Sequence, residues 1–120
     1  MNSFKVSAVG NLAKDPSLVK KGGKEFCRFC LVGNDYAGKD EQGDATEVTT
    51  AVWFVAFNGM AKAIGKARKG DQLVVEAHIR ANNYQAQDSD ETVYDYSYIV
   101  DGFRFGAPGK IKREELAHSR

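Results

Sequence analysis

The sequence contains few residues of the kinds that bind metals or carry out redox chemistry. Cys27 and Cys30 are its two cysteines, and His78 and His118 are its two histidines. A structural zinc site usually needs four ligands, and no second cysteine pair is present to complete one. A redox Cys-x-x-Cys motif normally opens a helix, whereas this pair lies in a strand-like run. We therefore expect two reduced thiols, no metal and no cofactor.

Long hydrophobic runs are absent as well. The longest apolar runs are a handful of residues, far short of the ~20 needed to cross a bilayer. The opening residues, Met-Asn-Ser-Phe-Lys, are not followed by the apolar segment of a signal peptide. These absences predict a cytoplasmic protein without a membrane partner.

The residue patterns of catalysis are also missing. No arrangement of serine, histidine and aspartate, or of cysteine and histidine, indicates a nucleophile and its base. The carboxylates of Asp88, Asp90, Glu91 and Asp95 could be interpreted as a magnesium site. However, they cluster in one loop-like segment instead of converging from separate strands. We expect a protein that is not an enzyme.

The net charge of +1 hides an uneven distribution along the chain. Residues 1–34, 51–86 and 102–120 carry net charges of +4, +3 and +3, whereas residues 35–50 and 87–101 carry −4 and −5. The basic blocks coincide with strand-like runs and the acidic blocks with polar, loop-like runs. This pattern predicts a basic surface patch on a nearly neutral protein. The alternative is that the acidic loops simply keep the protein soluble.

The periodicity of apolar residues predicts an all-β fold. Strand-like runs cover residues 4–10, 25–34, 48–57, 72–79 and 93–105, and the one helical stretch, residues 60–69, follows the third run. This order is typical of a five-stranded OB-fold barrel with one short helix between strands 3 and 4. Residues 1–106 are expected to form this domain, and residues 107–120 a short charged tail that is helical or disordered. The polar segments 37–47 and 85–91 are expected to be long loops.

Aromatic side chains occur in or beside the predicted strands, with cations between them. Flat rings on a sheet can stack unpaired bases, and nearby cations can neutralise the phosphates that link them. Single-stranded nucleic acid is therefore the leading partner. The candidate base-stacking residues are Tyr36, Trp53, Phe57 and Tyr84, and the candidate phosphate-binding residues are Lys5, Lys14, Lys24, Arg28, Lys62 and Arg80.

Two groups of aromatic residues keep alternative interpretations. Trp53 and Phe57 share one face of a regular strand and Phe54 takes the other, so Trp53 is either a base-stacking residue or part of the core. The row formed by Tyr94, Tyr96 and Tyr98 fits a core or an oligomer contact, and we do not assign it to DNA.

Several short motifs follow one another along the chain, namely Gly10-Asn11-Leu12 with Asp15-Pro16, Phe29-x-Leu31, Ala56-Phe57 with Met60-Ala61, and Lys69-Gly70-Asp71-Gln72-Leu73-Val74-Val75-Glu76. In this order they resemble the bacterial single-stranded DNA-binding protein family, from residue 4 to about residue 105. The resemblance implies that Tyr36, Phe57 and Tyr84 stack on bases. It also implies a homotetramer, with a dimer as the alternative, that coats single-stranded DNA in replication, recombination or repair at the nucleoid.

The sequence departs from the family pattern at its C-terminal end. Members that serve whole chromosomes usually carry a long tail with an acidic, apolar tip that docks partner proteins, whereas this sequence ends in Leu-Ala-His-Ser-Arg. The resemblance is therefore to a phage, plasmid or mobile-element version, or to a trimmed one, without tail-mediated protein partners. The alternative function is that of a primosomal-type adaptor with the same fold and weaker DNA binding.

Overall fold

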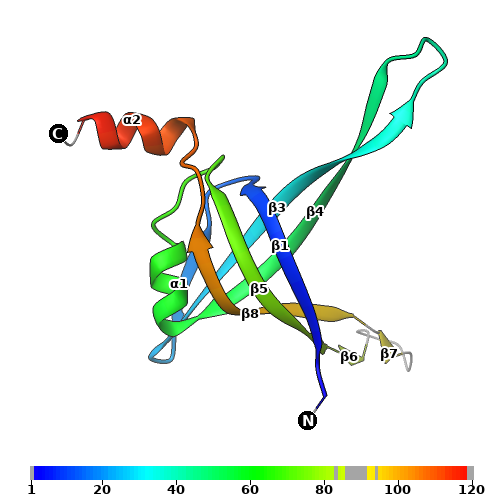
Figure 1. Cartoon of the computed structure of the whole chain (residues 1–120). Helices are drawn as coiled ribbons and strands as arrows, with labels where there is room; N and C mark the ends of the chain where they lie inside the picture. The colour runs from blue at the N-terminus through cyan, green and yellow to red at the C-terminus, as the bar shows by residue number, and fades with distance from the viewer. Residues whose placement is uncertain (1, 83, 86–91, 94, 119–120) are drawn as a thin grey trace.

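Five long strands close into a barrel (Figure 1). The computed structural model describes residues 2–82, 84–85, 92–93 and 95–118. Around the barrel the strands are β1 (Phe4–Leu12), β5 (Gln72–Ala81), β8 (Tyr96–Phe105), β4 (Ala45–Phe57) and β3 (Lys24–Lys39). All neighbours are antiparallel except β4 and β8, and a short pairing of β1 with β3 closes the ring. The predicted all-β, five-stranded barrel is confirmed.

Shorter elements decorate the barrel. Strand β2 (Ser17–Lys21) forms a hairpin with β3, and its turn uses Gly22 and Gly23 at φ of 59° and 77°. Strands β6 (Tyr84–Gln85) and β7 (Thr92–Val93) pair with each other. The predicted second loop between them falls largely on residues 86–91, which lie outside the described residues.

Helix α1 (Asn58–Ile64) follows β4, as predicted, but it is shorter than the expected range of 60–69. Glycine is a poor helix former, and Gly65 caps the helix. The chain then turns back, because the backbone N–H of Arg68 donates to the Asp71 carboxylate at 2.9 Å, and the N–H of Asp71 donates to the Arg68 carbonyl at 3.0 Å. The prediction that the helix continues over residues 65–69 is therefore wrong.

Strands β3 and β4 extend beyond the barrel as a two-stranded arm (Figure 1). Their pairing continues to Lys39 and Ala45, so the predicted long loop over residues 37–47 is wrong. The turn is tight because one carboxylate oxygen of Asp40 accepts the backbone N–H groups of Gln42 and Asp44, both at 2.9 Å. Most side chains of the arm face solvent, so the arm needs little apolar bulk. The backbone hydrogen bonds between its two strands hold it together.

The core fills the barrel with the side chains that alternate inward along each strand. On β3 these are Cys27, Phe29 and Leu31, and on β4 they are Phe54 and Ala56. The rings of Phe29 and Phe54 stack at 5.5 Å between centroids. Helix α1 contributes Ala61 and Ile64 to the same core. The residues between these inward positions on β3 and β4 therefore face outward.

The tail after β8 forms α2 (Lys110–His118), which corresponds to the helical alternative for this segment. None of its residues is buried, and polar contacts attach it to the barrel. The Arg68 Nε donates to Glu115 Oε1 at 2.9 Å, and the Lys112 ammonium donates to the Lys66 carbonyl at 2.7 Å. Neither α2 nor α1, the helices of the described residues, is long and apolar enough to cross a membrane.

Candidate nucleic-acid interface

The outer face of β4 presents two aromatic rings. Trp53 is 45% exposed and Phe57 is 44% exposed, whereas Phe54 and Ala56 between them are buried in the core. This alternation follows from the two-residue repeat of a strand. The structure therefore places Trp53 on the outside of the barrel and Phe54 inside it, which excludes the interpretation of Trp53 as a core residue.

A groove lies beside these rings, between β4 and β8. In the described part of the chain the two strands are paired only at Val55 and Ile99. Beyond this point they leave a groove of about 410 Å³. Its aromatic lining consists of Phe26, Trp53, Phe54, Phe57, Tyr96 and Tyr98, of which Phe54 belongs to the core. The groove brings together aromatic side chains from three strands that are far apart in the sequence.

Sequence reasoning missed three aromatic residues of this groove, Phe26, Tyr96 and Tyr98, of which Tyr96 is the most exposed. Its side chain is 61% exposed and lines the groove opposite the β4 rings. Tyr98, two residues later, is partly buried and packs against Phe54 at 6.0 Å between ring centroids. Tyr94 lies outside the described residues. Alternation alone could not separate these tyrosines, because Tyr96 and Tyr98 share a face and differ only in their distance from the end of the barrel.

Two of the predicted phosphate-binding cations lie over the Trp53 ring. The Lys14 Nζ is 5.3 Å and the Arg28 Cζ is 5.7 Å from the ring centroid. Arg28 is near because β3 pairs with β4, with Cys30 opposite Trp53. Lys14 is near because the preceding Ala13 N–H donates to the Cys30 carbonyl at 2.9 Å. Each such cation–π contact contributes about 0.5–1 kcal/mol at an exposed site.

A row of residues that pair between neighbouring strands crosses the outer surface of the barrel. It runs through consecutive register partners on β1, β5, β8, β4 and β3, namely Lys5, His78, Ile99, Val55 and Arg28. Neighbouring strands are about 4.8 Å apart, so Lys5 and Arg28 are separated by four strand spacings, roughly 19 Å along the surface. The row therefore has a cation at each end.

The next row along β4 and β8 contains Trp53 and another predicted cation. Trp53 and Ser97 each precede the parallel pair of Val55 and Ile99 by two residues, and Ser97 is paired with Arg80 of β5. Both Ser97 and Trp53 line the groove. The structure therefore places Arg80 across the groove from Trp53, at the same level of the barrel.

Of the two predicted base-stacking tyrosines, Tyr36 lies away from this groove, and the side chain of Tyr84 is not among those that the structure describes. Tyr36 is 65% exposed and sits on the arm opposite Glu47. It is eight residues along β3 from Arg28, which is roughly 26 Å at the rise of a strand. Tyr84 begins β6, and its side chain lies outside the part of the chain that the structure describes.

The remaining predicted cations are at the end of the barrel near α1. The Lys62 ammonium is 3.6 Å from the Glu25 carboxylate, which Lys20 also approaches at 3.8 Å. Lys24 is exposed beside the β2–β3 turn. These cations form a group separate from the pair over Trp53.

The two cysteines point to opposite sides of β3. Both are free and buried, but Cys27 lies in the core, whereas Cys30 lies opposite the outward-facing Trp53. Burial raises the pKa of the Cys27 thiol to about 11. The described residues contain no group of three or more histidine, cysteine or acidic side chains placed to hold a metal ion, and Asp88, Asp90 and Glu91 are not among them.

Two comparisons of the sequence with known proteins agree with each other. The profile of the Single-strand binding protein family matches residues 3–106. The chain is also similar to the "Single-stranded DNA-binding protein" of Clostridium perfringens (strain 13 / Type A), with 33% identity over 104 residues. This match covers 84% of the chain but 64% of that protein, so the chain spans less than two thirds of the relative's length.

Comparisons of the structure identify the same barrel in solved proteins. The Plasmodium falciparum SSB in complex with ssDNA gives a TM-score of 0.73 at 17% identity, covering 88% of this chain and 97% of that one. The small single-stranded DNA-binding protein of Streptomyces coelicolor gives a TM-score of 0.66 at 19% identity, covering 88% and 96%. At these identities the likeness demonstrates a shared fold.

Proposed function

The chain belongs to the single-strand binding protein family, and on this premise we propose that it binds single-stranded DNA without catalysis. The proposal rests on one observation. Half-exposed aromatic rings line a groove on the barrel, and two cations lie over the ring at its edge. Rings and cations together are what an unpaired strand needs, since its bases and its phosphates are both accessible.

The rings would supply most of the affinity and the preference for single strands. Each base stacked on an aromatic ring contributes about 1–3 kcal/mol. Trp53 and Phe57 are four residues apart on one face of β4, roughly 13 Å at the rise of a strand, so each can accept a different base. Stacking needs only the face of a base, which every base offers and which a duplex hides. Binding should therefore favour single strands and depend little on sequence.

The cations would neutralise phosphates and make binding depend on salt. Lys14 and Arg28 already lie over Trp53, so a base that stacks there brings its phosphate next to them. Arg80 and Lys5 continue this basic surface on β5 and β1. Each phosphate contact adds about 0.7 to the slope of log affinity against log salt on a single strand.

We further propose that residues 1–106 form the binding domain and residues 107–120 an accessory tail. Tyr36 on the arm, Tyr84 at β6, and Lys24 and Lys62 near α1 would extend the path of a longer strand around the barrel. A single barrel offers few stacking sites, and self-association would lengthen the path, which supports a homotetramer. Such a protein would act in replication, recombination or repair in the cytoplasm.

The test uses the fact that Trp53 is the one tryptophan of the chain. Stacking of a base on its ring should quench the tryptophan fluorescence, so titration with oligo-dT measures binding at the proposed site. We expect quenching that saturates at nanomolar to sub-micromolar concentrations and that a duplex of the same length does not reproduce. Trp53→Ala and Phe57→Ala, followed by fluorescence anisotropy of a labelled oligo-dT, should each weaken binding at least tenfold.

The matched control is Ile111→Ala, which removes a comparably exposed apolar side chain from α2. Its affinity for oligo-dT should equal that of the unaltered protein. Saturation without any change in tryptophan fluorescence would remove Trp53 from the site. Micromolar affinity combined with tight binding of a replication or recombination protein would instead support the adaptor function.

A further inference from the structure

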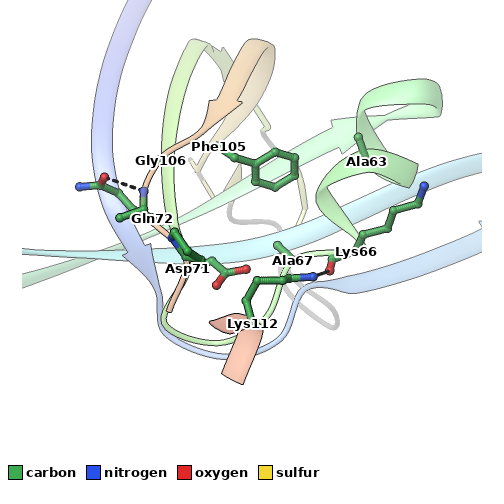
Figure 2. A pocket seen from close by; sticks show the side chains of 10 residues that line it. Ala63, Lys66, Ala67, Asp71, Gln72, Phe105, Gly106 and Lys112 are labelled. Atoms are coloured by element: carbon green, nitrogen blue, oxygen red, sulfur yellow. Dashed lines mark hydrogen bonds between the residues drawn. The ribbon is translucent and has the colours of Figure 1, made fainter. Parts of the chain in front are cut away.

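An apolar pocket lies away from the groove, between α1, the end of β8 and the start of α2 (Figure 2). Its volume is about 400 Å³, within the range of small binding sites. The ring of Phe105, which is 52% exposed, forms one wall, and Ala63 of α1 and Ala67 of the segment after α1 form another. Pro108 and the aliphatic part of Lys112 complete it. The lining is therefore almost entirely carbon.

The walls of this pocket are held by hydrogen bonds. The Asp71 carboxylate, which is buried, accepts the Gly109 N–H at 2.7 Å and the Arg68 N–H at 2.9 Å. The backbone of Gln72 pairs with Gly106 at 2.8 Å and with Ala107 at 2.9 Å. A Cβ on Gly109 would lie 2.5 Å from the Gly70 backbone, so this approach requires glycine. Because these walls are already fixed, a ligand can bind in the pocket without the free-energy cost of ordering them.

The residues that line the pocket include two cations and one carboxylate. The cations are Lys66 and Lys112, and the Asp71 carboxylate already accepts the N–H groups of Gly109 and Arg68. Arg68 and Lys112 are paired with Glu115 of α2. Lys66, which lines the pocket, has no carboxylate within ion-pair distance among the described residues. Its charge remains available to an anionic ligand.

The pocket and the groove are independent sites. Tyr96 of the groove and Phe105 of the pocket are the first and last residues of β8, which has 10 residues. At the rise of a strand they are roughly 30 Å apart. No residue lines both cavities. A ligand in the pocket would therefore leave the groove open.

We propose that this pocket binds an acidic peptide segment of a partner protein, with one bulky apolar side chain inside and a neighbouring carboxylate on Lys66. An apolar side chain suits the carbon lining, whereas a nucleobase would leave its polar edges without partners there. A second copy of the chain is disfavoured, because a two-fold contact pairs this surface with itself and so brings two copies of the unpaired Lys66 charge into one interface. Charge complementarity therefore selects an acidic peptide.

The experiment titrates the ¹⁵N-labelled full chain with the peptide acetyl-Asp-Asp-Leu-Asp-amide in the absence of DNA. We expect shifts of the amide signals of Gln72, Gly106 and Ala107, which border the pocket. The peptides acetyl-Asp-Asp-Ser-Asp-amide and acetyl-Lys-Lys-Leu-Lys-amide, each lacking one of the two required features, should bind at least fivefold more weakly. The DNA proposal is measured with different reagents at a different site, so either proposal can fail alone.

Two variants assign the binding to the pocket. Ala63→Leu, which fills the space opposite Phe105, should weaken the acidic peptide at least fivefold, provided that the melting temperature shows a folded protein. Lys66→Glu, an exposed change, should weaken it at least threefold, whereas the matched Lys69→Glu, outside the pocket, should not. Equal binding of the basic peptide, no effect of Lys66→Glu, or displacement of the peptide by oligo-dT would overturn the proposal. Dimerisation that Ala63→Leu abolishes would assign the pocket to a second copy instead and would also overturn it.

Discussion

At the scale of single residues, Trp53 combines the two interactions on which the proposed function depends. Trp53 faces outward from β4, and its ring is 45% exposed. The register of β3 against β4 brings Arg28 over this ring, and the turn after β1 brings Lys14 over it. A base that stacks on Trp53 must share the ring with these cations or displace them. The cations would then be placed at the phosphate beside that base.

The first prediction concerns these two cations. Lys14→Gln and Arg28→Gln should each reduce the slope of log affinity against log salt by about 0.7, because each removes one phosphate contact. The affinity for oligo-dT at low salt should fall in parallel, as measured by anisotropy at four or more salt concentrations. Lys110→Gln, on α2, is the control of equal charge change. An unchanged slope in both variants would show that neither side chain meets a phosphate.

The second prediction concerns the buried thiol of Cys27. Its pKa is raised from 9.0 to about 11 by desolvation, so the folded state keeps a proton that the unfolded state loses above pH 9. The stabilisation is complete below pH 9 and is lost as the pH rises towards 11, a total of about 2–3 kcal/mol. Urea unfolding at pH 8, 9, 10 and 11 measures this fall.

The control for this prediction is Cys27→Ala, which has no thiol to ionise. Other groups also titrate in this range, so the informative quantity is the difference between the two proteins. The unaltered protein should lose more stability between pH 9 and 11 than the alanine variant. Parallel curves would mean that the thiol ionises equally easily in both states.

At the scale of elements, the arm formed by the distal parts of β3 and β4 is built differently from the barrel. Its side chains are mostly exposed, and it is held by ladder hydrogen bonds and by the Asp40 turn. An element that buries so little apolar surface contributes little to the stability of the core. Its exposed Tyr36 suits contact with a ligand instead.

The third prediction removes this arm. Replacing residues 35–48 by Asn-Gly joins the paired residues Asn34 and Thr49 through a two-residue hairpin turn. The barrel should keep its fold, and its melting temperature should change by only a few degrees. Affinity for a long oligo-dT should fall about fivefold or more, the loss of one stacked base. Tyr36→Ala with the arm intact should show the same loss, and an unchanged affinity in both would exclude Tyr36 from the DNA path.

At the scale of the whole molecule, β1 has one free backbone edge along most of its length in the described structure. It pairs with β5 along most of its length but with β3 only at Asn11 and Leu12, so in the described structure residues 4–10 have one unpaired edge. Val9 on this strand is 62% exposed. An exposed strand edge with apolar side chains is a surface on which another chain can pair. This feature supports the proposed self-association.

The fourth prediction tests that surface. Val9→Lys places a charge on β1 without disturbing the core, because the side chain is already exposed, and it should convert the assembly into a smaller species. Light scattering, with and without oligo-dT, measures the mass. The matched control is Val48→Lys on the arm, where the wild-type valine is 53% exposed. Retention of the full mass in the Val9 variant would place the subunit contacts elsewhere.

The amino-acid sequence determined the barrel and which side chains share a face of a strand, because alternation along a strand is a local property. Spacing placed Trp53 and Phe57 on one face of β4 and Phe54 on the other, whereas the structure decided which of these faces is inward. The motifs around Lys69 and Gly70 also identified the family before any contact was known.

Only the tertiary structure decided which side chains meet. The separation of β4 and β8 beyond Val55 and Ile99 creates the groove and exposes Tyr96, and it depends on how strands close around a barrel. The pairing of Lys14 with Trp53 and the pocket under Phe105 likewise join residues distant in sequence. The arm was misjudged because its composition resembles a loop, whereas its hydrogen bonds come from a partner strand that composition does not reveal.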